Sequence, residues 1–328
     1  MSQRHRTPGP QTGRGVMKIV LGSMTFSDQA DEEVSLEMLR LFCAQGGEEV
    51  DTAYQYNGGN TERLLGKLLS AHPDLAAKIA TKVNPWDGNG LKPDEVRKQF
   101  VESRKRLQAG SVDMLYLHSP DLDTPIVDTL AVCWDFYRQG TFRRFGLSNF
   151  ASWQVAEVAE ICRSKGWMVP TVYQGMYNAL TRDVERELFP CLRNYGIRFY
   201  AYNPLAGGLL TGKHGNYADT PEPGRFTLND QYPSRYWKPE YFRVLQSLTA
   251  ACRGHGITPG EVALRWLVHH SRLSGDAKDA IILGASRLEH LQENLAACDR
   301  GGLPREVVSV LDEGWETVRG DCFRYFRP

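Results

Sequence analysis

The sequence lacks several features that mark special classes of protein. No apolar run approaches the roughly 18 residues that a membrane-spanning helix needs, so we expect no membrane partner. Lys and Arg total 39, Asp and Glu total 39, and the formal net charge is zero. Nucleic-acid-binding domains are usually strongly basic, so we expect no nucleic-acid partner either. With 41% hydrophobic and 24% charged residues, the composition is that of an ordinary globular protein.

Closely spaced cysteines are also missing. The seven cysteines stand at positions 43, 133, 162, 191, 252, 298 and 322, and no two of them form a CxxC pair. An odd, scattered set predicts reduced thiols, not a disulfide framework or a zinc site. We therefore expect a cytoplasmic protein without a bound metal.

The first 15 residues are rich in Gly, Pro and Arg and have no apolar core, which is not the pattern of a secretory signal. We expect residues 1–15 to form a disordered tail and residues 16–328 to form one domain. Arg4, Arg6 and Arg14 occur there without an acidic residue. An organelle transit segment therefore stays open as an alternative.

What the sequence does contain is an alternation of short apolar runs with longer amphipathic stretches. The runs occupy residues 19–21, 49–50, 78–81, 114–117, 145–147, 171–173, 197–201 and 280–283. Between them, apolar residues recur at helical spacing, as at Val155, Val158, Ala159 and Cys162. A second such stripe predicts a helix that begins at Val184 and continues through Leu188, Cys191 and Leu192. Eight strands alternating with helices predict a parallel sheet covered by helices, hence an α/β protein.

Two architectures fit this alternation. An open, doubly wound sheet is one, and a closed (β/α)8 TIM barrel is the other. We prefer the barrel because there are eight runs and because the polar residues of interest follow the ends of strands, where barrels place their active sites. Residues 212–239 interrupt the rhythm with Gly, Pro and aromatic residues, which predicts a long functional loop after the seventh strand. The remaining stretches predict extra helices towards the C-terminus.

Four polar residues stand at the predicted strand ends. Asp51 follows the second run and Tyr56 lies five residues beyond it, while Lys82 ends the third run and His118 ends the fourth. Each residue taken alone is more often a solvated loop residue than a functional one. Successive strands that carry an acid, a tyrosine, a lysine and a histidine to one mouth are far less common by chance.

These four side chains suit the reduction of a carbonyl group. That reaction needs a hydride on carbon and a proton on oxygen, and a phenol has an ordinary pKa of about 10. We expect the ammonium of Lys82 to lower the pKa of Tyr56, and Asp51 to hold Lys82 in place. We expect His118 to bond the carbonyl oxygen of the substrate. Tyr54 is interpreted as a packing residue.

At this point the sequence resembles the aldo-keto reductases, over nearly the whole chain from Met17 onwards. The resemblance rests on the segment from Asp51 to Tyr56 with Gly59 and Glu62, on Thr81-Lys82 and Leu117-His118, and on Gly146-Leu-Ser-Asn149. Segments 171–177, 187–192 and 198–213 are most similar to the aflatoxin aldehyde reductase and succinic semialdehyde reductase subfamily. The resemblance implies a barrel that binds NADPH/NADP+ without a Rossmann domain, with Asp51, Tyr56, Lys82 and His118 as the catalytic residues.

The resemblance, together with the chemistry of the side chains, also indicates the cofactor site. Ser148, Asn149 and Gln174 are expected to hold the nicotinamide carboxamide and Tyr202 to stack on its ring. Backbone groups from Asn203 onwards, together with Lys213, are expected to meet the pyrophosphate. Ser286 is expected to cap the next helix in a capping box with Glu289. The complete predicted cofactor set is Ser148, Asn149, Gln174, Tyr202, Asn203, Pro204, Leu205, Gly207, Lys213, Gly284, Ser286, Arg287, His290, Glu293 and Asn294.

Two details of that set bear on the nucleotide. Arg287, at a predicted helix N-terminus, suggests a 2′-phosphate and therefore NADPH over NADH. His290 stands where the family usually has an arginine, which weakens that preference. The segment from Gly207 to Lys213 also matches a P-loop, but His214 occupies the position of the magnesium-binding Ser or Thr, and no helix is predicted to follow.

Met24, Trp86 and His118 are expected to line the substrate site. The resemblance implies that Arg235 and Arg327 lie there too, and two guanidinium groups would favour an aldehyde that carries a carboxylate, such as succinic semialdehyde. Small aldehydes and dicarbonyls are thus the predicted substrates. An NADP-binding regulatory subunit with slow turnover, or another barrel enzyme that uses His118 and Asp51, are the alternatives. The subfamily suggests a homodimer.

Overall fold

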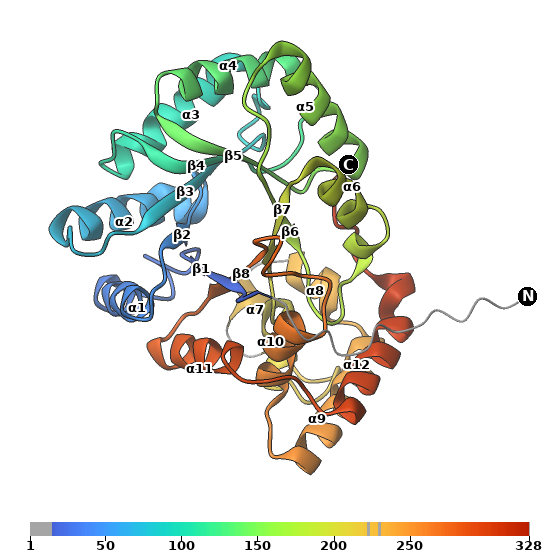
Figure 1. Cartoon of the computed structure of the whole chain (residues 1–328). Coiled ribbons are helices and arrows are strands. Elements are labelled where there is room, and N and C mark those ends of the chain that lie inside the picture. The colour runs from blue at the N-terminus through green and yellow to red at the C-terminus, as the bar shows by residue number, and fades with distance from the viewer. Residues whose placement is uncertain (1–14, 222–223, 229–230, 328) are drawn as a thin grey trace, which may run out of the picture.

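The computed structural model describes residues 15–221, 224–228 and 231–327. Eight parallel strands close into a barrel in chain order, and pairing of β1 with β8 completes the ring (Figure 1). The strands are β1 (Lys18–Gly22), β2 (Glu49–Asp51), β3 (Lys78–Val83), β4 (Val112–Leu117), β5 (Phe142–Ser148), β6 (Val172–Met176), β7 (Arg198–Tyr202) and β8 (Ala280–Gly284). Each predicted run overlaps one strand, so the (β/α)8 barrel is confirmed and the open sheet is wrong.

Helices surround the barrel. They are α1 (Glu32–Ala44), α2 (Asn60–Ala71), α3 (Pro93–Arg106), α4 (Ile126–Arg138), α5 (Ser152–Lys165), α6 (Leu188–Tyr195), α7 (Arg225–Leu228), α8 (Gln231–Tyr236), α9 (Pro239–His255), α10 (Pro259–His269), α11 (Leu288–Cys298) and α12 (Arg305–Val318). Four 3-10 turns are η1 (Tyr56–Gly59), η2 (Asp183–Glu185), η3 (Ala206–Thr211) and η4 (Arg319–Asp321). Extra helices towards the C-terminus are present as predicted, and the last of them, α12, packs against α9 (Figure 1).

Two segments differ from the sequence expectation. The segment predicted to be one long irregular loop, residues 212–239, contains the short helices α7 and α8. The apolar stripe that we extended back to Val184 does not form one helix, because Val184 lies in η2 and α6 begins only at Leu188. Pro190 explains the late start. It has no N–H to donate to the carbonyl of Arg186, so the helical hydrogen bond that would include residues before Leu188 cannot form.

A small layer of mostly apolar side chains fills the interior of the barrel, and Tyr116 is one of its largest members. Tyr116 on β4 is fully buried and points across the strand ladder to Gly146 on β5, its register partner. A Cβ at position 146 would lie 2.4 Å from two ring carbons of Tyr116. Glycine is therefore required at this position so that the ring fits. The other members of the layer are Val20, Ala80, Met114, Val172, Tyr200, Ala280 and Ile282.

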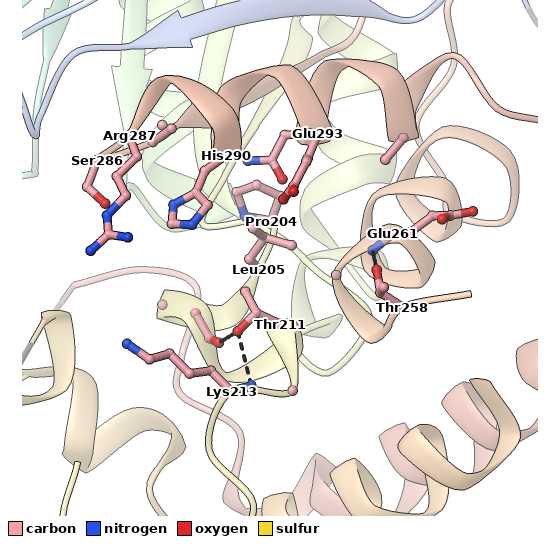
Figure 2. Close-up of a pocket in the computed structure, with 18 of the residues that line it drawn as sticks. Pro204, Leu205, Thr211, Lys213, Thr258, Glu261, Ser286, Arg287, His290 and Glu293 are labelled. Carbon is pink, nitrogen blue, oxygen red and sulfur yellow. Dashed lines mark hydrogen bonds between the residues drawn. The ribbon is translucent and has the colours of Figure 1, made fainter. Parts of the chain in front are cut away.

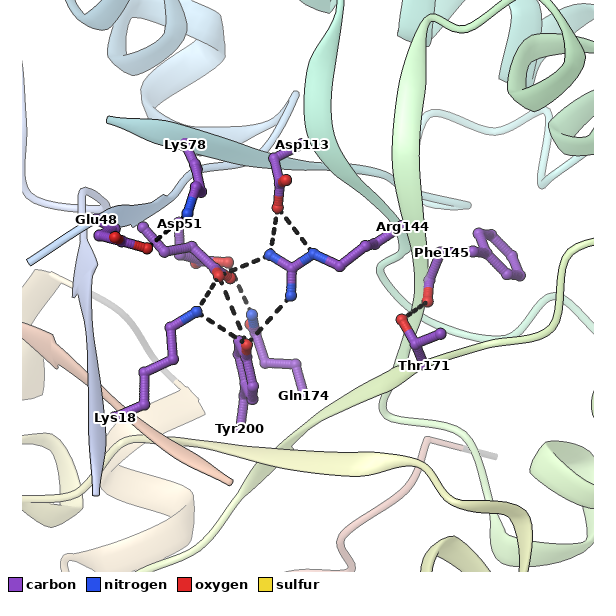
Figure 3. Close-up of polar contacts among 11 residues, drawn as sticks. Lys18, Glu48, Asp51, Lys78, Asp113, Arg144, Phe145, Thr171, Gln174 and Tyr200 are labelled. Atoms are coloured by element: carbon purple, nitrogen blue, oxygen red, sulfur yellow. Dashed lines mark hydrogen bonds and ion pairs between the residues drawn. The ribbon is translucent and has the colours of Figure 1, made fainter. Parts of the chain in front are cut away.

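Charged residues close the end of the barrel where the strands begin (Figure 3). The carboxylate of Glu49, which is fully buried, accepts hydrogen bonds from Lys18 Nζ at 2.6 Å and from Arg144 Nη2 at 2.7 Å. Arg144 also forms an ion pair with Asp113, and its Nη1 donates to the Tyr200 hydroxyl at 3.3 Å. Strands β1, β2, β4, β5 and β7 all contribute to this network, which we call the barrel floor.

Three further features concern the chain as a whole. Residues 1–14 of the predicted tail lie outside the described residues, and Gly15 N donates to Asp276 Oδ1 at 3.2 Å. No described helix combines the length and the apolar character needed to cross a membrane. Among residues 15–221, 224–228 and 231–327, no group of His, Cys, Asp or Glu side chains has the arrangement of a metal site.

Candidate active site

The four predicted catalytic residues come together at the mouth of the barrel, where the strands end. Asp51 and Lys82 leave the ends of β2 and β3, and both are buried. Lys82 Nζ donates to Asp51 Oδ2 at 2.7 Å, to the carbonyl oxygen of Thr52 at 2.7 Å and to the hydroxyl of Tyr56 at 3.1 Å. All three N–H groups of the ammonium are therefore used, and the phenol of Tyr56 lies directly beside a buried cation.

A tight turn holds Tyr56 in this position. Asn57, Gly58 and Gly59 all have left-handed backbone angles, with φ of 49°, 63° and 87°. The side-chain amide of Asn57 donates to the carbonyl oxygens of Met24 and Phe26, which ties the turn to the loop after β1. Asn and Gly are the residues that tolerate this conformation, so the sequence Asn57-Gly-Gly59 explains why the chain reverses directly after the tyrosine.

Tyr54, two residues before Tyr56, is held by Arg106 of α3. Arg106 Nη1 donates to the carbonyl oxygen of Tyr54 at 2.9 Å, and the guanidinium carbon lies 4.4 Å from the centre of the Tyr54 ring. Tyr54 packs against Arg106, in agreement with its interpretation as a packing residue.

Burial dominates the pKa of each group in this cluster. Burial and the charge of Asp51 raise the pKa of Tyr56 well above 10, so the expected acidic shift is wrong for the net effect. Burial lowers the pKa of Lys82 and raises that of Asp51, while the charge of each partner opposes its shift. The phenol is therefore protonated at neutral pH, which is the state in which a proton donor starts.

His118 completes the cluster. Its ring centroid lies 5.9 Å from that of Tyr56 and 4.8 Å from that of Trp86. Its Nδ1 is buried and has no hydrogen-bond partner among the described residues. Burial and the charges of Lys82 and Arg327 hold the pKa of His118 well below 6.5. A neutral imidazole here suits a hydrogen-bond donor to a substrate oxygen.

The predicted nicotinamide residues also lie at the mouth, where the structure gives them protein partners. Asn149 donates from Nδ2 to the carbonyl oxygen of His118 at 2.8 Å, and its Oδ1 accepts from the Tyr202 hydroxyl at 2.8 Å. Asn149 Nδ2 also donates to the hydroxyl of Ser148. Gln174 donates to Asp51 Oδ1 at 2.7 Å and lies inside β6, although the predicted strand, residues 171–173, stops just before it.

A groove of about 1060 Å³ leads away from the mouth between the β7 and β8 loops. Figure 2 shows Ser286, Arg287, His290 and Glu293 of α11 and the residues before it on one side, with Lys213 opposite. The predicted cofactor residues that line this groove are Asn203, Pro204, Leu205, Gly207, Lys213, Gly284, Ser286, Arg287, His290, Glu293 and Asn294. The remaining four, at positions 148, 149, 174 and 202, belong to the mouth.

The groove fits a dinucleotide. Its volume is that of a pocket for a large cofactor, and Lys213, Arg225 and Arg287 supply the positive charge that phosphates require. Gly207 and Gly208 have φ of 71° and 105°, and a Cβ on Gly207 would lie 2.4 Å from the Tyr232 ring. Glycine is therefore required at position 207, where the backbone of η3 packs against the Tyr232 ring.

The structure corrects one expectation about these loops. Helix α11 begins at Leu288 with Arg287 as its N-cap and no side-chain cap, so Ser286 forms no capping box. The argument against a P-loop agrees with the structure, because residues 206–211 form the 3-10 turn η3 and the next described helix, α7, starts only at Arg225.

Sequence reasoning missed Arg225. It lines the groove, its Nη1 donates to the Tyr232 hydroxyl at 2.8 Å, and its Nη2 lies 3.9 Å from where a Cβ of Gly284 would be. The segment that carries α7 therefore reaches the end of β8 across the groove. A basic residue in a Gly- and Pro-rich loop was the only signal, and such residues are common. Other missed lining residues are Thr25, Gln29, Thr211, Thr258, Glu261 and Arg300.

The predicted substrate residues surround the same mouth. Arg235 Nη2 and Arg327 Nη2 both donate to Gln231 Oε1, at 2.8 and 3.5 Å, so the two guanidinium groups converge. The guanidinium of Arg327 lies 4.6 Å from the centre of the Trp86 ring. Arg235 is 6% exposed, and its Nε is buried without a hydrogen-bond partner among the described residues. Met24 lies in the loop after β1, where it is partly buried.

An eight-stranded parallel barrel with a buried Asp–Lys pair beside a tyrosine and a histidine is the arrangement of an oxidoreductase. The chain belongs to the Aldo/keto reductase family, whose model matches residues 18–316. It is therefore an aldo-keto reductase, an enzyme of a family that reduces aldehydes with nicotinamide cofactors.

The similar proteins agree with the subfamily indicated by the sequence. The chain is 48% identical to aflatoxin B1 aldehyde reductase member 2 of Homo sapiens over 94% of this chain and 89% of that protein. It is 47% identical to the protein of the same name from Rattus norvegicus, over 98% and 92%. It is 46% identical to aflatoxin B1 aldehyde reductase member 4 of Homo sapiens, over 96% and 99%.

Proposed function

We propose that this enzyme reduces small aldehydes and dicarbonyls to alcohols with NADPH, and that Tyr56 provides the proton. The distance of 3.1 Å between the Tyr56 hydroxyl and the buried Lys82 ammonium carries this proposal. A bound reduced nicotinamide supplies the hydride. Tyr56 gives its proton to the oxygen of the substrate as negative charge develops there, and Lys82 stabilises the phenolate that remains.

The neighbouring groups prepare this proton transfer. Asp51 holds Lys82 by its carboxylate, and Gln174 fixes Asp51 in turn. His118 is neutral and orients the carbonyl oxygen towards Tyr56. Trp86 packs against His118 and limits access of water to the mouth.

Arg235 and Arg327 support a preference for aldehydes that also carry a carboxylate, of which succinic semialdehyde is the example. Their guanidinium groups converge on one amide oxygen, and an ionised carboxylate is a stronger acceptor at the same position. We expect Arg235→Ala to raise KM for succinic semialdehyde by roughly tenfold or more, and to change KM for an uncharged aldehyde much less. An equal change in both values of KM would contradict the preference.

The deciding experiment is a panel of aldehydes and dicarbonyls with NADPH and NADH, on wild type and Tyr56→Phe. We expect oxidation of NADPH with 4-nitrobenzaldehyde in wild type and a kcat lower by roughly 10²- to 10⁴-fold in the variant, with cofactor binding retained. Tyr54→Phe, in the same turn, is the matched control and should keep its activity. Tight NADPH binding without turnover in wild type would favour the regulatory-subunit alternative.

A cytoplasmic location and a homodimer complete the proposal and stay predictions. Cell fractionation and light scattering of the purified protein test them.

A further inference from the structure

The chain after η4 leaves the helices and crosses to the mouth of the barrel. Its last described residues contact the residue that precedes α6, through the hydrogen bond between Tyr325 and Glu187. Residues 322–327 form no helix or strand, and such terminal segments are ordered only where specific contacts hold them. The position of Arg327 at the substrate site therefore depends on what fastens this segment.

One phenol provides the main attachment. Tyr325 is only 4% exposed, and its hydroxyl accepts a hydrogen bond from Ser152 N at 3.1 Å. The same hydroxyl donates to the carboxylate of Glu187. Ser152 is the first residue of α5, and Glu187 directly precedes α6. A single side chain thus links the C-terminal segment to the starts of two barrel helices.

Two residues further on, the backbone makes a second attachment. Arg327 N donates to the carbonyl oxygen of Asn149 at 3.0 Å. Asn149 has a left-handed backbone with φ of 64°, and its side chain already joins the carbonyl of His118 to the hydroxyl of Tyr202. The Arg327 backbone is therefore fastened to the same loop that holds the catalytic histidine.

We propose that Tyr325 and Glu187 form a latch that positions Arg327, and thereby set how strongly this enzyme binds the carboxylate of its substrate. The latch rests on the proposed role of Arg327 in carboxylate binding. Neither latch residue touches the reacting atoms, so both are positioning residues. With the latch intact, the guanidinium is held ready before the substrate arrives. Without it, substrate binding must also order the segment, and the affinity falls.

The test uses Tyr325→Phe, which removes only the hydroxyl, and measures KM and kcat for succinic semialdehyde and for 4-nitrobenzaldehyde. We expect KM for the carboxylated aldehyde to rise about 3- to 10-fold, the net value of a hydrogen bond, with kcat retained. KM for the uncharged aldehyde should not change. Tyr195→Phe, a partly buried tyrosine at the end of α6, is the matched control and should behave as wild type.

Glu187 offers a second variant in case the buried change disturbs folding. Its side chain caps no helix N–H, and the residue is exposed, so Glu187→Ala should fold normally. We expect Glu187→Ala to reproduce the selective rise in KM and Glu187→Gln, which keeps an acceptor oxygen, to restore part of the affinity. In both latch variants, hydrogen exchange in the C-terminal peptide should be faster than in wild type, while the melting temperature stays the same.

Arg327→Ala distinguishes the role of Arg327 in carboxylate binding from the role of the latch. If Arg327→Ala removes the preference for carboxylated aldehydes and Tyr325→Phe leaves KM and hydrogen exchange unchanged, the latch is wrong and the carboxylate site stands. If Arg327→Ala itself leaves the preference unchanged, the role of Arg327 is wrong and the latch has no function in specificity.

Discussion

The imidazole of His118 is surrounded by positive charge and by apolar surface. Lys82 and Arg327 both disfavour its protonation, and burial does so more strongly. Its Nδ1 is buried without a partner among the described residues. A histidine in this environment is a permanent hydrogen-bond group rather than a proton donor that titrates near neutrality.

This charge state predicts the pH dependence of the reaction. Because the pKa of His118 lies well below 6.5, kcat/KM with an uncharged aldehyde should be level between about pH 6.5 and pH 8. Burial lowers the pKa of Lys82 below 10.5, and loss of its proton removes the stabilising charge, so activity should fall as the pH rises through that lowered pKa. A step near pH 6.5 that disappears in His118→Gln would contradict this account.

Arg287 provides a second prediction at the level of one residue. It lines the groove at the N-cap of α11, where an anion is favoured by the helix start and by the guanidinium together. We expect Arg287→Ala to weaken NADPH binding by roughly 10- to 100-fold and to leave NADH binding unchanged, as measured by quenching of tryptophan fluorescence. Arg305→Ala, an exposed change at the start of α12, is the control. Equal weakening of both cofactors would assign Arg287 to a phosphate that they share.

Single residues were predictable where strand ends decide their position. Asp51, Lys82 and His118 follow strands, and in a parallel barrel all strand ends meet at one mouth, so their convergence could be inferred from spacing alone. The direction of the Tyr56 pKa could not, because it depends on how deeply the phenol is buried. Arg225 begins the four-residue helix α7, which is too short to show a periodic pattern, and Tyr325 lies in a terminal segment without helix or strand.

At the level of elements, the pairing of β4 with β5 depends on Gly146, which has no side chain. The ring of Tyr116 occupies the space that a Cβ of residue 146 would need. This contact also fixes Tyr116 within the barrel interior, next to Lys82 on β3, its register partner.

Gly146→Ala should therefore destabilise the protein by about 1–3 kcal/mol, the usual cost of overpacking a filled core. Urea unfolding followed by circular dichroism measures it. Gly301→Ala is the matched control, because a Cβ there meets no atom within 4 Å and the residue is exposed. It should be neutral or slightly stabilising. Equal stability of the two variants would mean that the Tyr116 ring can move aside.

Elements were predictable in type and order but less so at their ends. The strands and the start of α3, with Pro93 and two acids in its first turn, follow from local sequence. The start of α6 was placed too early because apolar spacing ignores the missing N–H of Pro190. Helices α7 and α8 have only 4 and 6 residues, too few for a periodic pattern to show.

At the scale of the whole molecule, Glu49 in the barrel floor and its neighbour Glu48 should contribute differently to stability. Glu49 is fully buried and pairs with Lys18 and Arg144, whereas Glu48 is 63% exposed and pairs with Lys78 on the outside (Figure 3). Glu49→Gln removes the carboxylate that pairs with Lys18 and one of the two that pair with Arg144, whose ion pair with Asp113 remains. It should lower the free energy of unfolding by about 3 kcal/mol, the lower end of the cost of breaking a buried ion pair. Glu48→Gln should cost at most about 1 kcal/mol. Similar losses in both variants would show that burial does not strengthen this network.

The barrel floor has a consequence for how molecules enter and leave. In the described part of the chain, apolar side chains fill the barrel interior and ion pairs close its far end, so the aldehyde enters and the alcohol leaves through the mouth. An alcohol that still carries the carboxylate would be retained by the same arginines that attracted the aldehyde. Inhibition by accumulated alcohol should accordingly compete with the aldehyde, and its strength should parallel the affinity for the carboxylate.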